Sequence, residues 1–225
     1  MTGRDVRQAR KQKRWTQADL AEKLGVTQAY VSLLESDRRD VPRRLQPKLV
    51  ALLHLPANEL PLTGDADPLP ERRVAAVLAS LGYPGFAHLA SARKLNPAEL
   101  LARTLRRPHV EARLAEALPW VLVHYANLDW EWLVAQAKQH DVQNRLGFVV
   151  TLARELADRS GDAPTTQVLR TWEGVLQRSR LQKEDCFAGD TLTDAERRWL
   201  HTNRSAEAVQ WNMLSNVSVD TLTDA

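Results

Sequence analysis

Apolar side chains recur at helical spacing along most of the chain beyond residue 70. They fall three or four positions apart, which is the pattern of helices that bury one face. No stretch alternates apolar and polar residues between turn signals, as a half-buried strand would. The sequence therefore predicts an all-α protein. The clearest stripes are Val74, Val77, Leu78 and Leu81; Val110, Leu114, Ala117 and Leu118; Leu146, Val149, Val150, Ala153, Leu156 and Ala157; and Leu169, Trp172 and Leu176.

Helix boundaries are marked at several places. The segment Asn96-Pro97-Ala98-Glu99 combines a capping Asn with a proline in the first helical position. The segment Thr193-Asp194-Ala195-Glu196 has the form of a capping box. Gly82 and Gly161 stand where helices should end. Together with the apolar stripes, these signals predict seven to nine helices in the C-terminal part.

A change of composition separates two parts of the chain. Residues 56–70 contain four prolines and one glycine. Each proline removes a backbone donor and disfavours helix in the residue before it, so we expect a short helical turn followed by a linker. The predicted organisation is an N-terminal domain of five short helices over residues 1–66 and a larger helical bundle over residues 71–225.

Charge and tryptophan are divided between the same two parts. Residues 1–54 hold 12 Lys and Arg against 6 Asp and Glu, whereas residues 55–225 hold 19 against 22. The first part contains Trp15, and the other six tryptophans lie beyond it. A basic N-terminal part indicates a polyanionic partner, although a solvated basic face would give the same excess.

Two short helices joined by a tight turn are predicted between residues 16 and 35. The first begins after a capping Thr16 and the second after a capping Thr27. Gly25 supplies the positive φ that the turn requires, and Ala21 is small where the helices approach each other. A helix, a four-residue turn and a second helix form the motif that places its second helix in the major groove of DNA. The expected buried positions are Leu20, Leu24, Val26, Val31 and Leu34.

Residues 4–60 resemble the Cro/C1-type helix-turn-helix family of phage repressors and bacterial regulators. The resemblance covers about a quarter of the chain. A hydrophobic core alone would not require Thr-Gln at two helix starts with arginines flanking the second helix. The resemblance implies a lambda-repressor-like domain that binds double-stranded DNA. The matching residues are Arg10-Lys11, Thr16-Gln17, Leu20-Ala21, Leu24-Gly25-Val26-Thr27-Gln28, Val31-Ser32, Leu34-Glu35, Arg38-Arg39, Pro42 and Leu45.

The resemblance assigns roles by position. Gln28 can bind an adenine through two hydrogen bonds, and the methyl group of Ala29 suits a thymine methyl. Arg10 and Glu35 match a buried ion pair of the family that joins the first helix to the third. The expected base-reading residues are Thr27, Gln28, Ala29, Ser32 and Leu33, and the expected phosphate-binding residues are Gln17, Arg38, Arg39, Arg43 and Arg44.

Two interpretations are open for each of three further residues of this domain. Tyr30 suits either a DNA contact or packing against a neighbouring helix. Lys11 and Lys13 suit either phosphate contacts or a solvated face. DNA shape is expected to supplement direct readout, because Ala29 and Leu33 offer no hydrogen bonds.

Catalytic chemistry is not indicated after residue 70. The histidines lack metal-ligand spacing, and no nucleophile elbow, phosphate loop or dinucleotide fingerprint occurs. Cys186 follows two acidic residues that disfavour a thiolate, and a lone cysteine leaves no disulfide or Cys-pair zinc site. We expect no enzyme activity, no metal and no cofactor. Since no apolar run approaches a membrane span or a signal peptide, we expect a cytoplasmic protein without a membrane partner.

The function that the sequence favours is sequence-specific transcriptional regulation, with repression of the chain's own operon as its form. Residues 133–152, with Arg145-Leu146-Gly147-Phe148, resemble the C-terminal region of abortive-infection antitoxins. This second resemblance implies an alternative, an antitoxin that binds a toxin protein through the C-terminal domain and regulates its own operon. An enzyme with an attached DNA-targeting module is a third interpretation, and no motif supports it.

A homodimer is expected because one recognition helix covers only a few base pairs. Two-fold dimers place two heads on half-sites about 34 Å apart, which is one turn of DNA. The first 66 residues offer no spare apolar face for a dimer interface. The interface is therefore predicted within residues 110–225, with Trp120, Trp130, Trp132 and Trp211 as candidates. For most of the aromatic residues between 120 and 157, packing in the core is the first interpretation and a partner surface the alternative.

Overall fold

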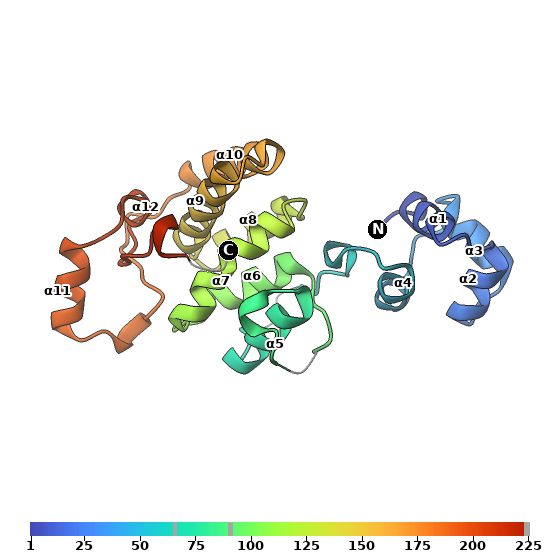
Figure 1. The fold of residues 1–225 in the computed structure, drawn as a ribbon, viewed down its shortest axis with the longest axis horizontal. Coiled ribbons are helices and arrows are strands. Elements are labelled where there is room, and N and C mark those ends of the chain that lie inside the picture. The colour runs from blue at the N-terminus through green and yellow to red at the C-terminus, as the bar shows by residue number, and fades with distance from the viewer. Residues whose placement is uncertain (65–66, 90–91, 223–225) are drawn as a thin grey trace. The chain divides into compact units, whose positions relative to one another are not determined.

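The structure is a computed structural model in which residues 1–64, 67–89 and 92–222 are described. These residues form twelve α-helices and four short 3-10 turns, and their one β feature is an isolated bridge between Asp185 and Met213. The predicted all-α class is therefore confirmed. The contacts divide the chain into two compact units, residues 1–63 and residues 64–225 (Figure 1).

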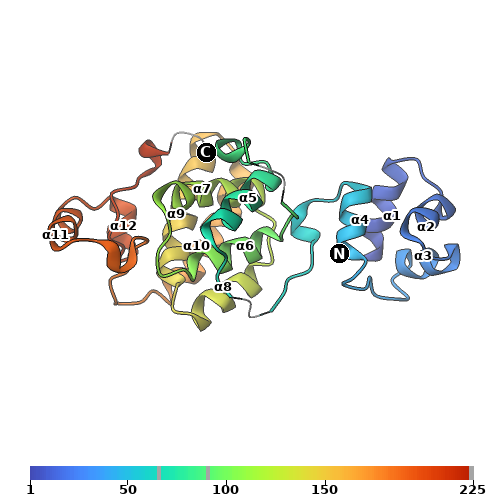
Figure 2. The same cartoon turned by 90° about the horizontal axis from the view of Figure 1, so that it is seen from below.

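Unit 1 is built from four α-helices and one 3-10 turn. Helix α3 packs against α1 and α2, and α4 covers the same two helices (Figure 2). Of the five helices predicted here, the last is a single 3-10 turn, because it begins after Pro56 and the chain is extended again at Leu60. The elements are α1 (Gly3–Gln12), α2 (Gln17–Leu24), α3 (Gln28–Glu35), α4 (Gln46–Leu53) and η1 (Ala57–Glu59). The core consists of Val6, Ala9, Leu20, Ala21, Leu24, Val31, Val41, Leu49 and Leu53.

A buried ion pair joins α1 to α3 inside this small core. The guanidinium of Arg10 donates two hydrogen bonds to the carboxylate of Glu35, from Nε at 2.6 Å and from Nη2 at 2.8 Å. Both side chains are more than nine-tenths buried. Arg10 Nη1 also donates to the carbonyl of Trp15, and Gln17 Nε2 donates to Glu35 at 3.0 Å. The pair expected from the sequence is thus present, and it also reaches the start of α2.

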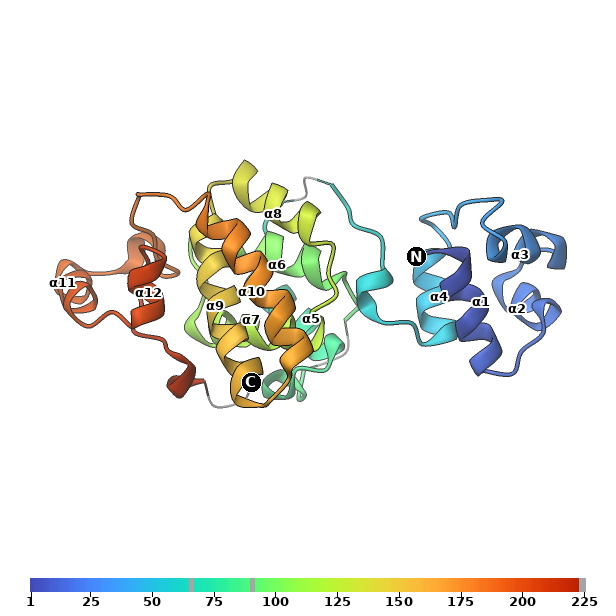
Figure 3. The same cartoon turned by 90° about the horizontal axis from the view of Figure 1, so that it is seen from above.

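Unit 2 is organised around its longest helix, α9 (Gln143–Arg159). Helix α10 (Ala163–Gln177) lies along α9, and α7 (Ala112–His124), α8 (Trp130–Gln139) and α12 (Ala206–Gln210) also contact it (Figure 3). The described part of unit 2 holds eight α-helices, within the predicted seven to nine. The remaining elements are α5 (Glu71–Leu81), η2 (Pro84–Phe86), α6 (Pro97–Leu105), η3 (Gly189–Thr191), α11 (Asp194–Thr202) and η4 (Val219–Thr221).

The predicted helix boundaries in unit 2 are confirmed. Asn96 caps α6 by accepting from the backbone N–H of Ala98 at 2.9 Å. Thr193 and Glu196 form the capping box of α11. Gly82 ends α5 with φ of 105°, and Gly161 follows α9 with φ of 75°. Both values lie in the left-handed region, which only glycine enters without strain.

Three of the tryptophans predicted to form a dimer interface are core residues. Trp120, Trp130 and Trp211 are 5%, 4% and 0% exposed, and Trp132 is half-buried. Trp130 stacks on Trp172 with ring centroids 5.6 Å apart. The core interpretation is thus confirmed for Trp120 and Trp130, and the interface role predicted for all three is wrong, because a helical bundle fills its interior with its largest side chains before any are left for a partner.

Trp211 is held by a glycine and a hydroxyl group on α9. Its indole Nε1 donates to Thr151 Oγ1 at 2.7 Å. A Cβ on Gly147, one turn earlier in α9, would lie 2.3 Å from the indole ring. The ring therefore packs directly on the α9 backbone, and Gly147 is required by this close approach rather than by its φ.

We predict that replacing Arg10 by methionine destabilises unit 1 by about 3–5 kcal/mol, because it leaves the buried carboxylate of Glu35 without its partner. The exposed Arg4 of the same helix provides a matched control, and Arg4→Met should change stability by less than about 0.5 kcal/mol. Hydrogen exchange of the α1 and α3 amides in the full chain measures both effects.

The penalty of Arg10→Met should depend on pH. Burial alone would raise the pKa of Glu35, but hydrogen bonds from Arg10 and Gln17 outweigh burial and hold that pKa below its ordinary value. The stabilisation is therefore complete above the ordinary carboxyl pKa of about 4.3 and is lost as pH falls through the lower folded-state pKa. A penalty that stayed constant from neutral pH to about pH 3 would contradict this origin.

We predict opposite effects for two glycine-to-alanine substitutions within helices of unit 2. Gly147→Ala forces Cβ into the Trp211 indole and should cost about 1–3 kcal/mol. Gly174→Ala in α10 meets nothing within 4 Å, so better helix propensity should raise stability by about 0.5–1 kcal/mol. Chemical denaturation followed by tryptophan fluorescence compares the two, and equal effects would refute the packing explanation.

Candidate nucleic-acid interface

Helices α2 and α3 are joined by a tight, fully capped turn. Thr16 and Asp19 form a capping box at the start of α2. Gly25 ends α2 with φ of 74°, and the N–H of Val26 donates back to the Ala21 carbonyl at 3.0 Å. Thr27 Oγ1 then accepts from the third backbone N–H of α3 at 3.2 Å. Because each end is satisfied locally, the angle between the two helices is fixed by the sequence of the turn.

Helix α3 presents one exposed stripe. Its inward side consists of Val31, Leu34 and Glu35. All five residues predicted to read bases are exposed, and the four within the helix follow the spacing i, i+1, i+4 and i+5 of a single face. Leu33, at 38%, is the one large apolar side chain of unit 1 that the structure describes as exposed. The five residues Thr27, Gln28, Ala29, Ser32 and Leu33 are called the reading face below.

The loop after α3 carries the four predicted phosphate-binding arginines. Arg38, Arg39, Arg43 and Arg44 are all exposed, and the described residues form no ion pair with any of them. The loop is fixed at its start, where the Asp37 carboxylate accepts from the first N–H of α1 at 2.6 Å. The backbone N–H groups of Arg38 and Arg39 donate to the carbonyl of Leu33. Two of the arginines are therefore held at the C-terminal end of α3.

Tyr30, which is half-buried, packs against one of these arginines. The guanidinium carbon of Arg39 lies 4.9 Å from the centroid of the Tyr30 ring. Sequence reasoning missed this contact because the loop after α3 folds back along the helix, and no local signal predicts that path. The stacking directs a cation to the edge of the reading face.

Gln17 and Lys13 both make contacts within the protein that the sequence did not predict. The Gln17 amide donates to Glu35, so one of its two amide hydrogens serves the ion pair and the other is left for a phosphate. Lys13 Nζ lies 5.2 Å from the centroid of the Trp15 ring, and Lys23 Nζ lies 5.0 Å from it. The phosphate role of Gln17 stays a prediction.

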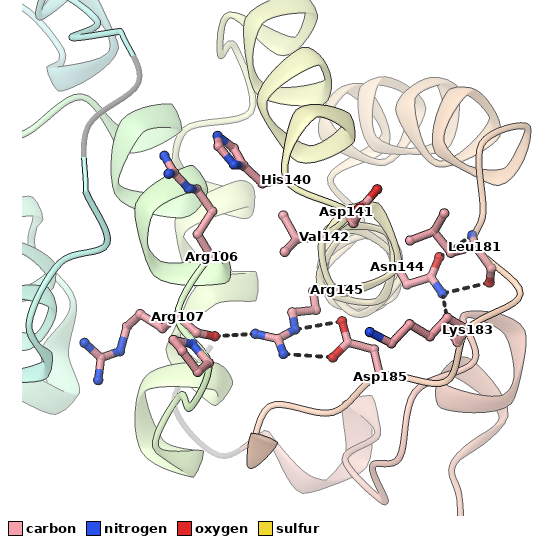
Figure 4. Close-up of a pocket in the computed structure, with 11 residues that line it drawn as sticks. Arg106, Arg107, His140, Asp141, Val142, Asn144, Arg145, Leu181, Lys183 and Asp185 are labelled. Atoms are coloured by element: carbon pink, nitrogen blue, oxygen red, sulfur yellow. Dashed lines mark hydrogen bonds and ion pairs between the residues drawn. The ribbon is translucent and has the colours of Figure 1, made fainter. Parts of the chain in front are cut away.

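Unit 2 contains a cavity of about 390 Å³ beside the N-terminus of α9 (Figure 4). Arg145 crosses its wall and uses all five guanidinium hydrogens. It donates to both carboxylate oxygens of Asp185 and to the carbonyls of Leu105, Arg107 and Cys186. Every donor of Arg145 is thus used inside the protein, and the residue tethers three chain segments together.

The segment that resembles abortive-infection antitoxins contributes side chains to the interior of unit 2. Arg145 is 7% exposed, Leu146 is fully buried, and Phe148 is 1% exposed. Gly147 supports the Trp211 ring. These residues pack unit 2, so they do not form a surface that a toxin could contact.

The described residues contain no group of three His, Cys, Asp or Glu side chains that could hold a metal ion. Burial raises the pKa of the Cys186 thiol, which donates weakly to the Gly189 carbonyl. Among the described helices, none has the length and apolar character needed to cross a membrane.

Comparison with known proteins assigns unit 1. A family model described as helix-turn-helix matches residues 6–59, from within α1 to the last residue of η1. No curated protein and no solved structure matches the chain significantly. The family match coincides with the capped α2–α3 turn and with the buried pair that orients α3. Unit 1 is therefore a DNA-binding helix-turn-helix domain of the Cro/C1 type.

Proposed function

We propose that the protein is a sequence-specific repressor of its own operon that reads its operator with α3. The observation that carries the proposal is the exposed reading face, followed in the chain by four exposed arginines that form no ion pair with the described residues. The positive charge of such a guanidinium is not neutralised by a carboxylate of the described chain. Each arginine can therefore neutralise one phosphate and release counterions. Binding in this form would cover promoter DNA and exclude polymerase.

Few side chains of the reading face can form hydrogen bonds with base edges. Gln28 can form two hydrogen bonds with an adenine, and Ser32 can donate or accept one turn later. Ala29 and Leu33 place apolar groups between them, where a thymine methyl is the matching group in the major groove. Each good two-bond contact supplies about 1–3 kcal/mol of discrimination, so one head separates operator from random DNA only modestly. The proposal therefore includes a homodimer that binds two half-sites.

The direct test is binding of the full chain to DNA from immediately upstream of its own gene. Fluorescence anisotropy at several salt concentrations should give tighter binding than to random DNA of equal length, with a steep loss of affinity as salt rises. Equal affinity for the upstream DNA and the random DNA would contradict the proposal.

We predict that Gln28→Ala and Arg43→Ala fail in different ways. Gln28→Ala should weaken operator binding by about 1–3 kcal/mol and relax the preference at one base position, with little effect on random DNA. Arg43→Ala should weaken binding to all sequences alike and lower the salt slope by about one. Titrations of operator and random DNA with both variants check this, and equal loss on both DNAs for Gln28→Ala would reassign that residue to the backbone.

We predict that the ring of Tyr30 matters for DNA binding and that its hydroxyl does not. Tyr30→Phe keeps the surface under Arg39 and should bind like the wild type. Tyr30→Leu should lose about 0.5–1 kcal/mol on all sequences, because Arg39 is no longer held.

A double-mutant cycle isolates this role of Tyr30. In an Arg39→Ala background, Tyr30→Leu should cost nothing more, because the interaction has already been removed. A loss with Tyr30→Phe, or an additive loss in the cycle, would show that Tyr30 contacts DNA directly.

A further inference from the structure

The cavity beside the N-terminus of α9 is lined mainly by polar side chains. Six of its eleven lining residues are Asp, Lys or Arg, and four of these six are basic. Its apolar lining consists of Pro108, Val142 and Leu181. The volume of about 390 Å³ lies near the lower end of the roughly 300–1,000 Å³ that is usual for ligand pockets. The cavity therefore suits a small polar ligand, and the excess of basic residues favours an anion.

Two of the lining arginines already use their guanidinium groups within the protein. Arg145 donates all five of its hydrogens to Asp185 and to three backbone carbonyls. Arg107 donates to two backbone carbonyls and to the carboxylate of Glu71. Figure 4 shows the Arg107 guanidinium directed away from Arg145. Neither arginine presents a fork of donors to a ligand in the cavity.

Lys183 is a lining cation whose charge the protein does not use. Its side chain is exposed, and no hydrogen bond or ion pair joins its ammonium group to a described residue. The backbone that carries it is fixed, because the buried amide of Asn144 donates to the carbonyls of Leu181 and Lys183 at 3.0 and 3.3 Å. Figure 4 shows the Lys183 side chain turned toward Arg145. A positive charge is thus placed at the cavity and left available.

The acidic residues of the lining do not take up this charge. Asp185 accepts from two guanidinium nitrogens of Arg145, each at 2.8 Å. Asp141 is exposed, and Figure 4 shows its carboxylate directed away from Lys183. A ligand that approaches Lys183 therefore meets a positive charge without a carboxylate competing for it.

The first turn of α9 adds further donors to the same cavity. Val142 is its N-cap and supplies no side-chain acceptor. The N–H groups of Gln143, Asn144 and Arg145 have no acceptor among the described residues. Because Val142, Asn144 and Arg145 line the cavity, these uncapped groups and the positive end of the helix dipole strengthen the preference for an anion that Lys183 establishes.

The donors that remain suit a phosphate better than a carboxylate. An ammonium group and single backbone N–H groups bind separate oxygens, and a phosphomonoester offers three terminal oxygens. A planar carboxylate is best matched by a guanidinium fork, and the forks of Arg107 and Arg145 are used inside the protein. A nucleobase would need an aromatic surface for stacking, and the described lining contains no Phe, Tyr or Trp.

We propose that this cavity binds the phosphate group of a small phosphomonoester without a nucleobase, such as a sugar phosphate. Lys183 and the first N–H groups of α9 are its donors. All of these residues belong to unit 2, so the inference goes beyond the proposed DNA binding and does not depend on it.

The first experiment is calorimetric titration of the full chain with ribose-5-phosphate and with glycerol-3-phosphate. At least one of them should saturate a single site, and Lys183→Gln should weaken its binding at least about tenfold, because a charge-assisted hydrogen bond is lost. Lys94→Gln is the matched control, since Lys94 is an exposed lysine of the same unit outside the cavity lining, and it should bind like the wild type. Circular dichroism should show both variants folded.

The second experiment locates the bound phosphate, because the basic surface of unit 1 also attracts anions. Hydrogen exchange of the full chain should slow at the amides of residues 143–145 when the phosphomonoester is added, since the phosphate then accepts from them. Exchange in α3 should stay unchanged. Protection in unit 1 without protection at residues 143–145 would overturn the proposal.

The remaining outcomes are equally decisive. Absence of binding of both phosphomonoesters up to about 10 mM overturns the proposal. Equal affinity for succinate, a dicarboxylate, overturns the preference for phosphate, and unchanged affinity in Lys183→Gln overturns the assignment of the donor. Inorganic phosphate that binds as tightly as either ester would show an adventitious ion only. Each result leaves the regulator proposal standing, because operator binding is measured separately.

Discussion

The orientation of α3 depends on the ion pair between Arg10 and Glu35. The inward side of α3 offers only Val31 and Leu34 besides Glu35, and two aliphatic side chains fit a small core in more than one rotation of the helix. A bidentate pair at 2.6 and 2.8 Å permits one rotation, because turning the helix would strand two buried charges. That rotation decides which residues face outward. The ion pair therefore fixes which side of α3 is exposed.

Unit 2 uses a buried arginine in a related way. Arg145 joins the start of α9 to two other segments, residues 105–107 and 185–186, through Asp185 and three backbone carbonyls, so it closes long loops that have little regular structure of their own. An arginine suits this task because its five donors lie in a fixed plane, whereas a lysine has three donors on a single nitrogen. In unit 1 one arginine, Arg10, orients a helix. In unit 2 another, Arg145, connects loops to the start of α9.

What the sequence could predict follows from the range of each interaction. The caps at Thr16, Gly25 and Thr27 act within four residues, and these local patterns placed α2 and α3 correctly. The stacking of Arg39 on Tyr30 depends on how a loop folds back, and no local pattern encodes that path. The burial of Trp211 depends on a glycine 64 positions earlier in the chain, so composition alone indicated a partner surface where there is core. Roles in DNA binding came from family resemblance, because exposure shows which side chains are available and not what they bind.

The modest chemistry of the reading face is the reason why the proposed function includes a second head. Only Gln28 and Ser32 offer side-chain hydrogen bonds along the exposed stripe inside α3, so under that proposal a single head would leave much of its affinity to arginines that bind any sequence. Additional arginines would strengthen binding to every DNA sequence alike, so the ratio of operator affinity to non-specific affinity would stay unchanged. Coupling two heads multiplies the discrimination of each, because a wrong half-site then forfeits contacts already made at the other.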